Sequence, residues 1–146
     1  MRIRLTGGVA IAAVVFTGAG CGGGDDTLTK AEFIKQADAI CTKAHNAFEK
    51  AFNQTFSGNQ QPSQVQLSKF AENTLVPGIQ GQIDDIRDLN PPSADQDQVD
   101  TFIDAVEAGV NKIKADPTIL APAVRADPLK KGHQLAKEYG LKECAD

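Results

Sequence analysis

Apolar residues recur at three- and four-residue steps along most of the chain, which is the spacing of amphipathic α-helices. The pattern predicts a first helix over about residues 30–56, a second over about 64–89 and a third over about 94–114. The stripe of the first helix is the longest and consists of Phe33, Ala37, Ile40, Cys41, Ala44, Ala47, Phe48, Ala51 and Phe52. Because each stripe occupies one side of its helix, the helices are expected to bury these sides against one another.

Polar residues mark where two of these helices begin. Thr29 and Glu32 have the spacing of a capping box at the start of the first helix. Ser93 and Gln96 have the same spacing just before the third helix. Both pairs predict a helix whose first free backbone N–H groups are satisfied by side chains.

Two Asp-Pro pairs follow the third helix, at residues 116–117 and 127–128. In each pair the aspartate suits an N-cap and the proline suits the first helical position. The first pair predicts a short turn or helix. The second predicts a final helix over about 128–139, with Gly140 just after its end.

Pro77 lies inside the second predicted helix. The apolar pattern keeps its phase across Val76-Pro77-Gly78, which favours one helix with a kink at Pro77. A proline inside a helix removes one backbone hydrogen bond and clashes with the preceding turn, at a typical cost of about 3 kcal/mol. The alternative is two helices with a break near residue 77.

The chain has no segment that alternates between apolar and polar residues, and it has no internal repeat. The sequence therefore predicts an all-α fold. Helices with one-sided stripes bury them against each other, so the expected architecture is a small antiparallel bundle of three or four helices.

The N-terminal segment has the layout of a secretory signal peptide. After a short basic start, residues 5–20 carry no charge, and small residues lead up to Cys21. This cysteine indicates a bacterial lipoprotein signal, in which Cys21 is lipidated and becomes the first residue of the mature chain. The position three before it is Gly18, where such signals usually have a larger apolar residue. The alternatives are ordinary signal-peptidase cleavage near Ala19 or Gly20, and a transmembrane anchor, for which roughly 20 apolar residues are needed.

The chain is thus expected to consist of a signal peptide (1–20), a lipid-anchored flexible tether (21–27) and one helical domain (28–146). The expected location is the outer face of the cytoplasmic membrane. With 19 acidic and 15 basic residues the net charge is −4, which argues against nucleic-acid binding. Trp is absent and Tyr occurs once, so phenylalanine supplies most aromatic surface.

The three cysteines fit this scheme. If Cys21 carries the lipid, Cys41 and Cys144 remain as a pair in an oxidising compartment. Their disulfide would attach the C-terminal tail to the middle of the first helix. It would close a loop of about 100 residues, which the chain-entropy model values at about 4–5 kcal/mol.

Three fragments together resemble a known family. They are residues 28–41 (LTKAEFIKQADAIC), Leu89-Asn90-Pro91-Pro92 and residues 136–144 (AKEYGLKEC). The chain is similar to a group of small secreted lipoproteins of actinobacteria, which share this first-helix phrase, a helical body and a Tyr-Gly-Leu ending beside a cysteine. The resemblance implies a high-GC Gram-positive envelope, an outward-facing anchor and pairing of Cys41 with Cys144. Members have no assigned activity, so it implies no catalytic residues.

Two sets of residues could bind a metal ion. Cys41, His45, His133 and Cys144 supply the two Cys and two His of a tetrahedral zinc site, but their spacing matches no compact zinc finger and the compartment favours the disulfide. A second set lines one face of the third helix and consists of Asp97, Asp100, Asp104 and Glu107. Like charges at this spacing repel one another mildly, and a divalent cation or a basic partner would offset that repulsion. The preferred interpretation is a solvated face.

The sequence contains no Gly-x-Ser-x-Gly elbow, phosphate loop or dinucleotide fingerprint. We therefore expect no enzyme and no cofactor, but a binding module for an envelope component, a protein or a small ligand. Its phenylalanines are expected to be mostly core and to line any apolar cavity, which could open at the Pro77 kink; they are Phe33, Phe48, Phe52, Phe70 and Phe102. The alternatives are a divalent-cation binder and an envelope enzyme, which would gather His45 or His133 with two carboxylates in a cleft.

Overall fold

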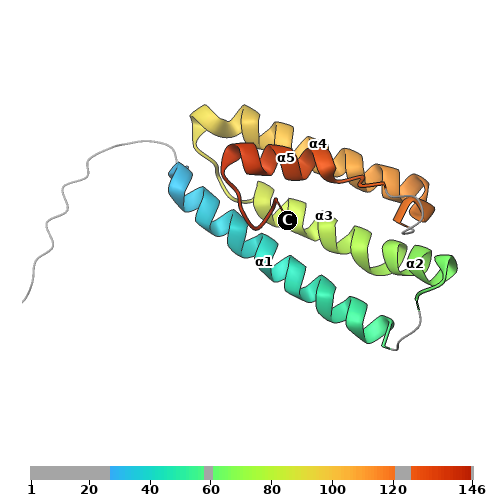
Figure 1. The fold of residues 1–146 in the computed structure, drawn as a ribbon. Helices are drawn as coiled ribbons and strands as arrows, with labels where there is room; N and C mark the ends of the chain where they lie inside the picture. Colours follow the sequence, from blue (N-terminus) through green and yellow to red (C-terminus); the bar gives the residue numbers. More distant parts are fainter. Residues whose placement is uncertain (1–26, 58–60, 121–125, 146) are drawn as a thin grey trace, which may run out of the picture.

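The computed structural model of the chain describes residues 27–57, 61–120 and 126–145, all of which are helical or irregular, without a strand. The predicted signal peptide, most of the tether and Cys21 lie outside this part. The main helices are α1 (Lys30–Thr55), α2 (Gln64–Phe70), α3 (Val76–Arg87), α4 (Gln96–Ala115) and α5 (Lys130–Tyr139) (Figure 1). Short turns join them, and these are η1 (Ala71–Leu75), η2 (Ser93–Asp95) and η3 (Pro117–Leu120). The all-α prediction is confirmed, and none of the helices in the described residues is long and apolar enough to cross a membrane.

The start of α1 confirms the first capping box. Thr29 Oγ1 accepts the backbone N–H of Glu32 at 3.3 Å, and Glu32 Oε2 accepts the backbone N–H of Thr29 at 3.0 Å. The Thr29 hydroxyl also donates to Glu32 Oε2 at 2.6 Å, and this bond, followed by that from the Thr29 backbone N–H, lowers the pKa of Glu32. The second predicted box, between Ser93 and Gln96, is wrong. After the two prolines the chain first makes the η2 turn, in which Asp95 donates its N–H to Pro92, so α4 begins only at Gln96 and Ser93 lies outside its first turn.

The second predicted helix is continuous from α2 through η1 to α3, and the break near residue 77 is not present. Its irregular part lies before Pro77, because η1 is a π-helical turn in which the N–H of Val76 bonds to the carbonyl of Ala71, five residues back. A proline cannot donate a backbone hydrogen bond and its ring clashes with the carbonyl four residues earlier. The wider turn of η1 accommodates both effects without ending the helix.

The first Asp-Pro pair caps the η3 turn, as predicted, whereas the second caps only the turn before α5, whose own N-cap is Leu129 without a side-chain bond. Asp116 Oδ1 accepts the backbone N–H of Thr118 at 3.0 Å, and Asp127 Oδ1 accepts the backbone N–H of Leu129 at 3.1 Å. The helix α5 begins at Lys130, two residues later than predicted, because residues 128–129 form a turn.

Gly140 lies just after the end of α5, as predicted, and closes the helix with a Schellman motif. Gly140 has a φ of 109°, a conformation that favours glycine. Its N–H bonds to the carbonyl of Lys137 at 3.1 Å, and the N–H of Leu141 bonds to the carbonyl of Ala136 at 2.9 Å. The chain thereby reverses, and the buried Leu141 directs the tail towards α1.

Buried apolar side chains form two clusters. The larger joins the first half of α1 to α3, α4, α5 and the tail, and its largest members are Phe33, Ile86, Phe102, Ile103, Tyr139 and Leu141. The smaller lies where η1, α3, α4 and η3 meet and consists of Ala71, Val76, Val110 and Ile113. Helices α4 and α5 approach closely at Gly132, where a Cβ atom would lie 2.5 Å from Val106 Cγ2.

The tail is held on α1 by a covalent and a polar attachment. Cys41 and Cys144 form the predicted disulfide. One turn earlier on α1, the carboxylate of Asp38 accepts the backbone N–H groups of Lys142 at 3.3 Å and Glu143 at 3.0 Å. The tail, residues 141–145, accordingly lies beside the middle of α1 (Figure 1).

Candidate functional site

Four phenylalanine rings gather where the end of α1 meets α2. Phe48, Phe52 and Phe56 follow one another at four-residue steps on α1 and its C-cap, and Phe70 ends α2. The ring centroid of Phe70 lies 5.5 Å from that of Phe48, 5.6 Å from that of Phe52 and 5.3 Å from that of Phe56. Phe70 is therefore the centre of an aromatic cluster that connects the two helices.

This aromatic cluster lies outside both buried core clusters. Phe70 is buried, but Phe52 and Phe56 are only half-buried and 36% of Phe48 is exposed. The prediction that the phenylalanines are mostly core holds for Phe33, Phe70 and Phe102, which are buried, and is wrong for Phe48 and Phe52.

The exposure follows from how α1 is covered. The fully buried residues of α1 are Phe33, Ala37 and Cys41, all in its first half. The tail reaches α1 at Cys41, and the second half of α1 lies apart from α4 and α5 (Figure 1). The apolar stripe continues for about four turns beyond Cys41, and there α2 covers it only in part, through Phe70.

A groove opens beside the aromatic cluster, with a volume of about 280 Å³. Its apolar lining comes from Phe56 and Phe70, and its polar lining consists of Thr55, Gln66, Lys69, Asn73 and Thr74. The π-helical turn η1 supplies the last two of these residues. Such turns frequently occur at functional sites. The groove was expected at Pro77, but it lies one turn earlier along the chain.

Lys69 is the charged residue of this groove. Its side chain makes no ion pair with a described residue, whereas its backbone carbonyl accepts the Asn73 side-chain amide at 2.8 Å. Gln66 is engaged elsewhere, because its Oε1 accepts the backbone N–H of Ser63 at 2.9 Å. The groove thus combines an aromatic wall with a lysine that no described acidic residue pairs with.

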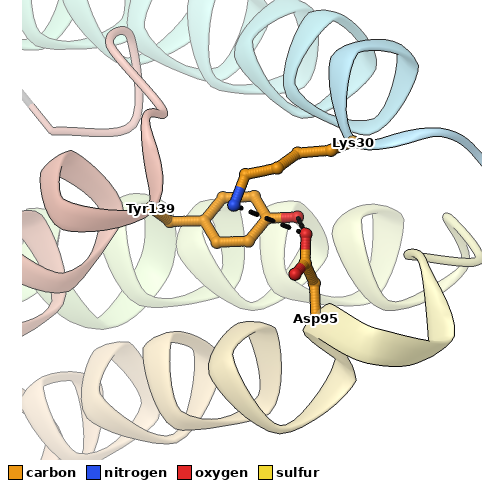
Figure 2. Close-up of polar contacts among 3 residues, drawn as sticks. All are labelled: Lys30, Asp95 and Tyr139. Carbon is orange, nitrogen blue, oxygen red and sulfur yellow. Dashed lines mark hydrogen bonds and ion pairs between the residues drawn. The ribbon is translucent and has the colours of Figure 1, made fainter.

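A second polar site joins the beginning of α1, the η2 turn and the end of α5 (Figure 2). The Tyr139 hydroxyl donates to Asp95 Oδ2 at 3.0 Å, and Lys30 Nζ lies 3.4 Å from the same oxygen and 4.1 Å from the centre of the Tyr139 ring. Burial and the Asp95 carboxylate raise the pKa of Tyr139 well above its usual value of 10.0. These contacts tie together three separate parts of the chain, which is a structural role.

The acidic face of α4 is solvent-exposed at Asp97, Asp100 and Asp104. Glu107 forms an ion pair with Arg87 of α3 at 2.7 Å, and this contact lowers the pKa of Glu107 and raises that of Arg87. Within the part of the chain that the structure describes, no three His, Cys, Asp or Glu side chains are grouped so that they could hold a metal ion.

The histidines lie on different helices, His45 exposed on α1 and His133 half-buried on α5. Because Cys41 and Cys144 are bonded to each other, they are not free thiolates for the zinc site considered above. The groove contains neither histidine nor carboxylate.

Several important residues were missed from the sequence. Phe56 continues the four-residue spacing of Phe48 and Phe52, which is the sequence signal that could have identified it. No sequence pattern distinguishes Asp38 from other acidic residues on helices, and only the folded tail shows its two backbone partners. No sequence pattern identifies Lys69, because its lack of an acidic partner among the described residues depends on the folded structure.

Comparison of the chain with protein-family models, curated proteins and solved structures gives no match.

Proposed function

We propose that the protein is a non-catalytic binding module at the outer face of the cytoplasmic membrane, anchored there by a lipid on Cys21. In this proposal it belongs with the small secreted actinobacterial lipoproteins that it resembles. Its helices form an antiparallel bundle, and its binding surface is the aromatic groove between α1 and α2.

The half-exposed aromatic cluster is the observation that carries this function. Burial of a phenylalanine side chain contributes about 1.5–3 kcal/mol, so leaving Phe48, Phe52 and Phe56 partly in water forgoes stabilisation. Exposed apolar patches of this kind often mark ligand or partner sites. The adjoining groove gives that surface a shape into which part of a ligand can be inserted.

The disulfide supports the proposed location. Disulfides persist in oxidising compartments and are rare in the cytosol, so the Cys41–Cys144 bond agrees with export. The short connections between successive long helices favour the antiparallel arrangement, because a short connection leaves the next helix running back along the previous one.

Site-specific photocrosslinking in the native envelope tests the proposal. A photoreactive amino acid replaces Phe56 in one variant and the exposed Asp97 of α4 in a matched control. The proposal predicts a defined adduct from position 56 that position 97 does not form. Equal labelling at both positions would argue against a binding site at the aromatic cluster.

The lipid anchor is tested separately by the intact mass of the mature protein. The proposal predicts a mature protein that begins with acylated Cys21.

A further inference from the structure

We propose that the groove beside the aromatic cluster binds an amphiphile with one aliphatic chain and one negative charge, such as a fatty-acid carboxylate. The chain lies against Phe56 and Phe70, and the carboxylate contacts Lys69. This inference rests on the binding function proposed above and adds the chemical class of the ligand.

The charge of the groove selects the sign of the ligand. The protein is acidic, with 19 acidic against 15 basic residues, yet the groove contains one lysine and no carboxylate. Lys69 has no acidic partner among the described residues, so its ammonium group is available to a ligand anion. The remaining polar lining is neutral and consists of Thr55, Gln66, Asn73 and Thr74. An anionic head group therefore meets attraction here and no repulsion from the groove itself.

The size of the groove limits the ligand to one chain. Its volume of about 280 Å³ lies at the lower end for small-molecule sites, which span about 300–1,000 Å³. That space suits a single aliphatic chain and not the two chains of a phospholipid. Beyond Phe56, the half-buried Phe52 ring continues the apolar surface, with its centroid 4.7 Å from that of Phe56. A longer chain can extend over it.

The single cation also indicates the kind of head group. A lysine ammonium is a compact point charge with three donors, which suits one carboxylate. Phosphate groups are usually bound by several donors, often with an arginine that makes paired hydrogen bonds. The groove has no arginine, and the side-chain amide of Asn73 already donates to the backbone carbonyl of Lys69. A carboxylate is therefore the head group that fits best.

Titration of the ¹⁵N-labelled protein with decanoate, below its micelle concentration, tests the inference by NMR. Decanoate is expected to shift the amide signals of Phe56, Phe70 and Thr74. Lys69→Gln is expected to weaken decanoate binding about three- to fivefold, the range of a partly exposed ion pair. The matched control is Lys35→Gln, an exposed lysine in the first half of α1, which should leave the affinity unchanged. Melting curves of both variants confirm that they are folded.

A second probe separates the charge of the ligand from its chain. If decyltrimethylammonium, which has the same chain and a positive head, binds as tightly as decanoate, the assignment to Lys69 is wrong while an apolar binding site remains. If Lys69→Gln and the unaltered protein bind decanoate with equal affinity, Lys69 does not bind the head group, although the apolar binding site remains. If neither amphiphile shifts the groove signals, the ligand class is overturned, and the crosslinking at position 56 then decides independently whether the groove binds another partner.

Discussion

Replacing Cys41 and Cys144 together by alanine is expected to lower the free energy of unfolding by about 4–5 kcal/mol. The two residues are 103 positions apart, and a cross-link over about 100 residues is worth about 4.7 kcal/mol in the chain-entropy model. Alanine is preferred to serine because both sites are buried, at 3% and 8% exposed, and a buried hydroxyl without a partner would add a separate cost.

This loss is a large fraction of the stability of a domain of this size, which is typically about 5–15 kcal/mol. It corresponds to a fall in melting temperature of roughly 12–25 °C. The protein should nevertheless remain folded, because Asp38 and the Schellman motif at Gly140 hold the tail on α1 without the bond.

The assay is urea unfolding followed by circular dichroism, with and without reductant. Every sample carries Cys21→Ala so that no third thiol can exchange with the pair. Reductant should lower the midpoint of the protein that retains Cys41 and Cys144 and leave the alanine variant unchanged. A difference in unfolding free energy below about 1 kcal/mol would refute the reasoning that the bond mainly restricts the unfolded chain.

Two further predictions concern single residues. Tyr139→Phe should lower stability by about 1 kcal/mol, since it removes the hydrogen bond to Asp95. Because the pKa of Tyr139 is raised in the folded protein, its stabilising contribution is complete below pH 10.0 and is lost as the pH rises further. The urea midpoint should therefore fall less between about pH 8 and about pH 11 for Tyr139→Phe than for the unaltered protein. An equal fall in both proteins would contradict this prediction. Gly140→Ala should lower the unfolding free energy by about 1–2 kcal/mol, because the φ of Gly140 is positive. In the same urea assay the control Gly81→Ala should raise it by about 0.5–1 kcal/mol, because no atom lies near the added Cβ. Similar unfolding free energies for the two variants would contradict the Schellman geometry.

Local chemistry allowed much of the fold to be predicted from the sequence. The helix starts at Thr29 and Asp116 and the helix end at Gly140 depend on residues within a few positions, so the sequence pattern is sufficient there. The capping box predicted at Ser93 is absent, and the reason is also local. The two prolines before it lead the chain into a 3₁₀ turn, and that turn delays the start of α4 beyond the reach of its side chain.

Features that depend on distant residues could not be predicted. The spacing of Phe48 and Phe52 is the same as that of the buried Phe33 and Ala37, so periodicity assigns all four to the core. What separates them is the length of α5 and the point at which Cys144 attaches the tail. Those features decide which half of α1 is covered, and hence where the aromatic groove opens.

Contacts between a bound aliphatic chain and the aromatic cluster test the central proposal most directly. Isotope-filtered nuclear Overhauser spectra of the labelled protein with decanoate would detect them. The proposal predicts contacts from the chain to the ring protons of Phe56 and Phe70, and none to the ring of Phe102 in the main core. Contacts elsewhere on the protein, without any to Phe56 or Phe70, would contradict it.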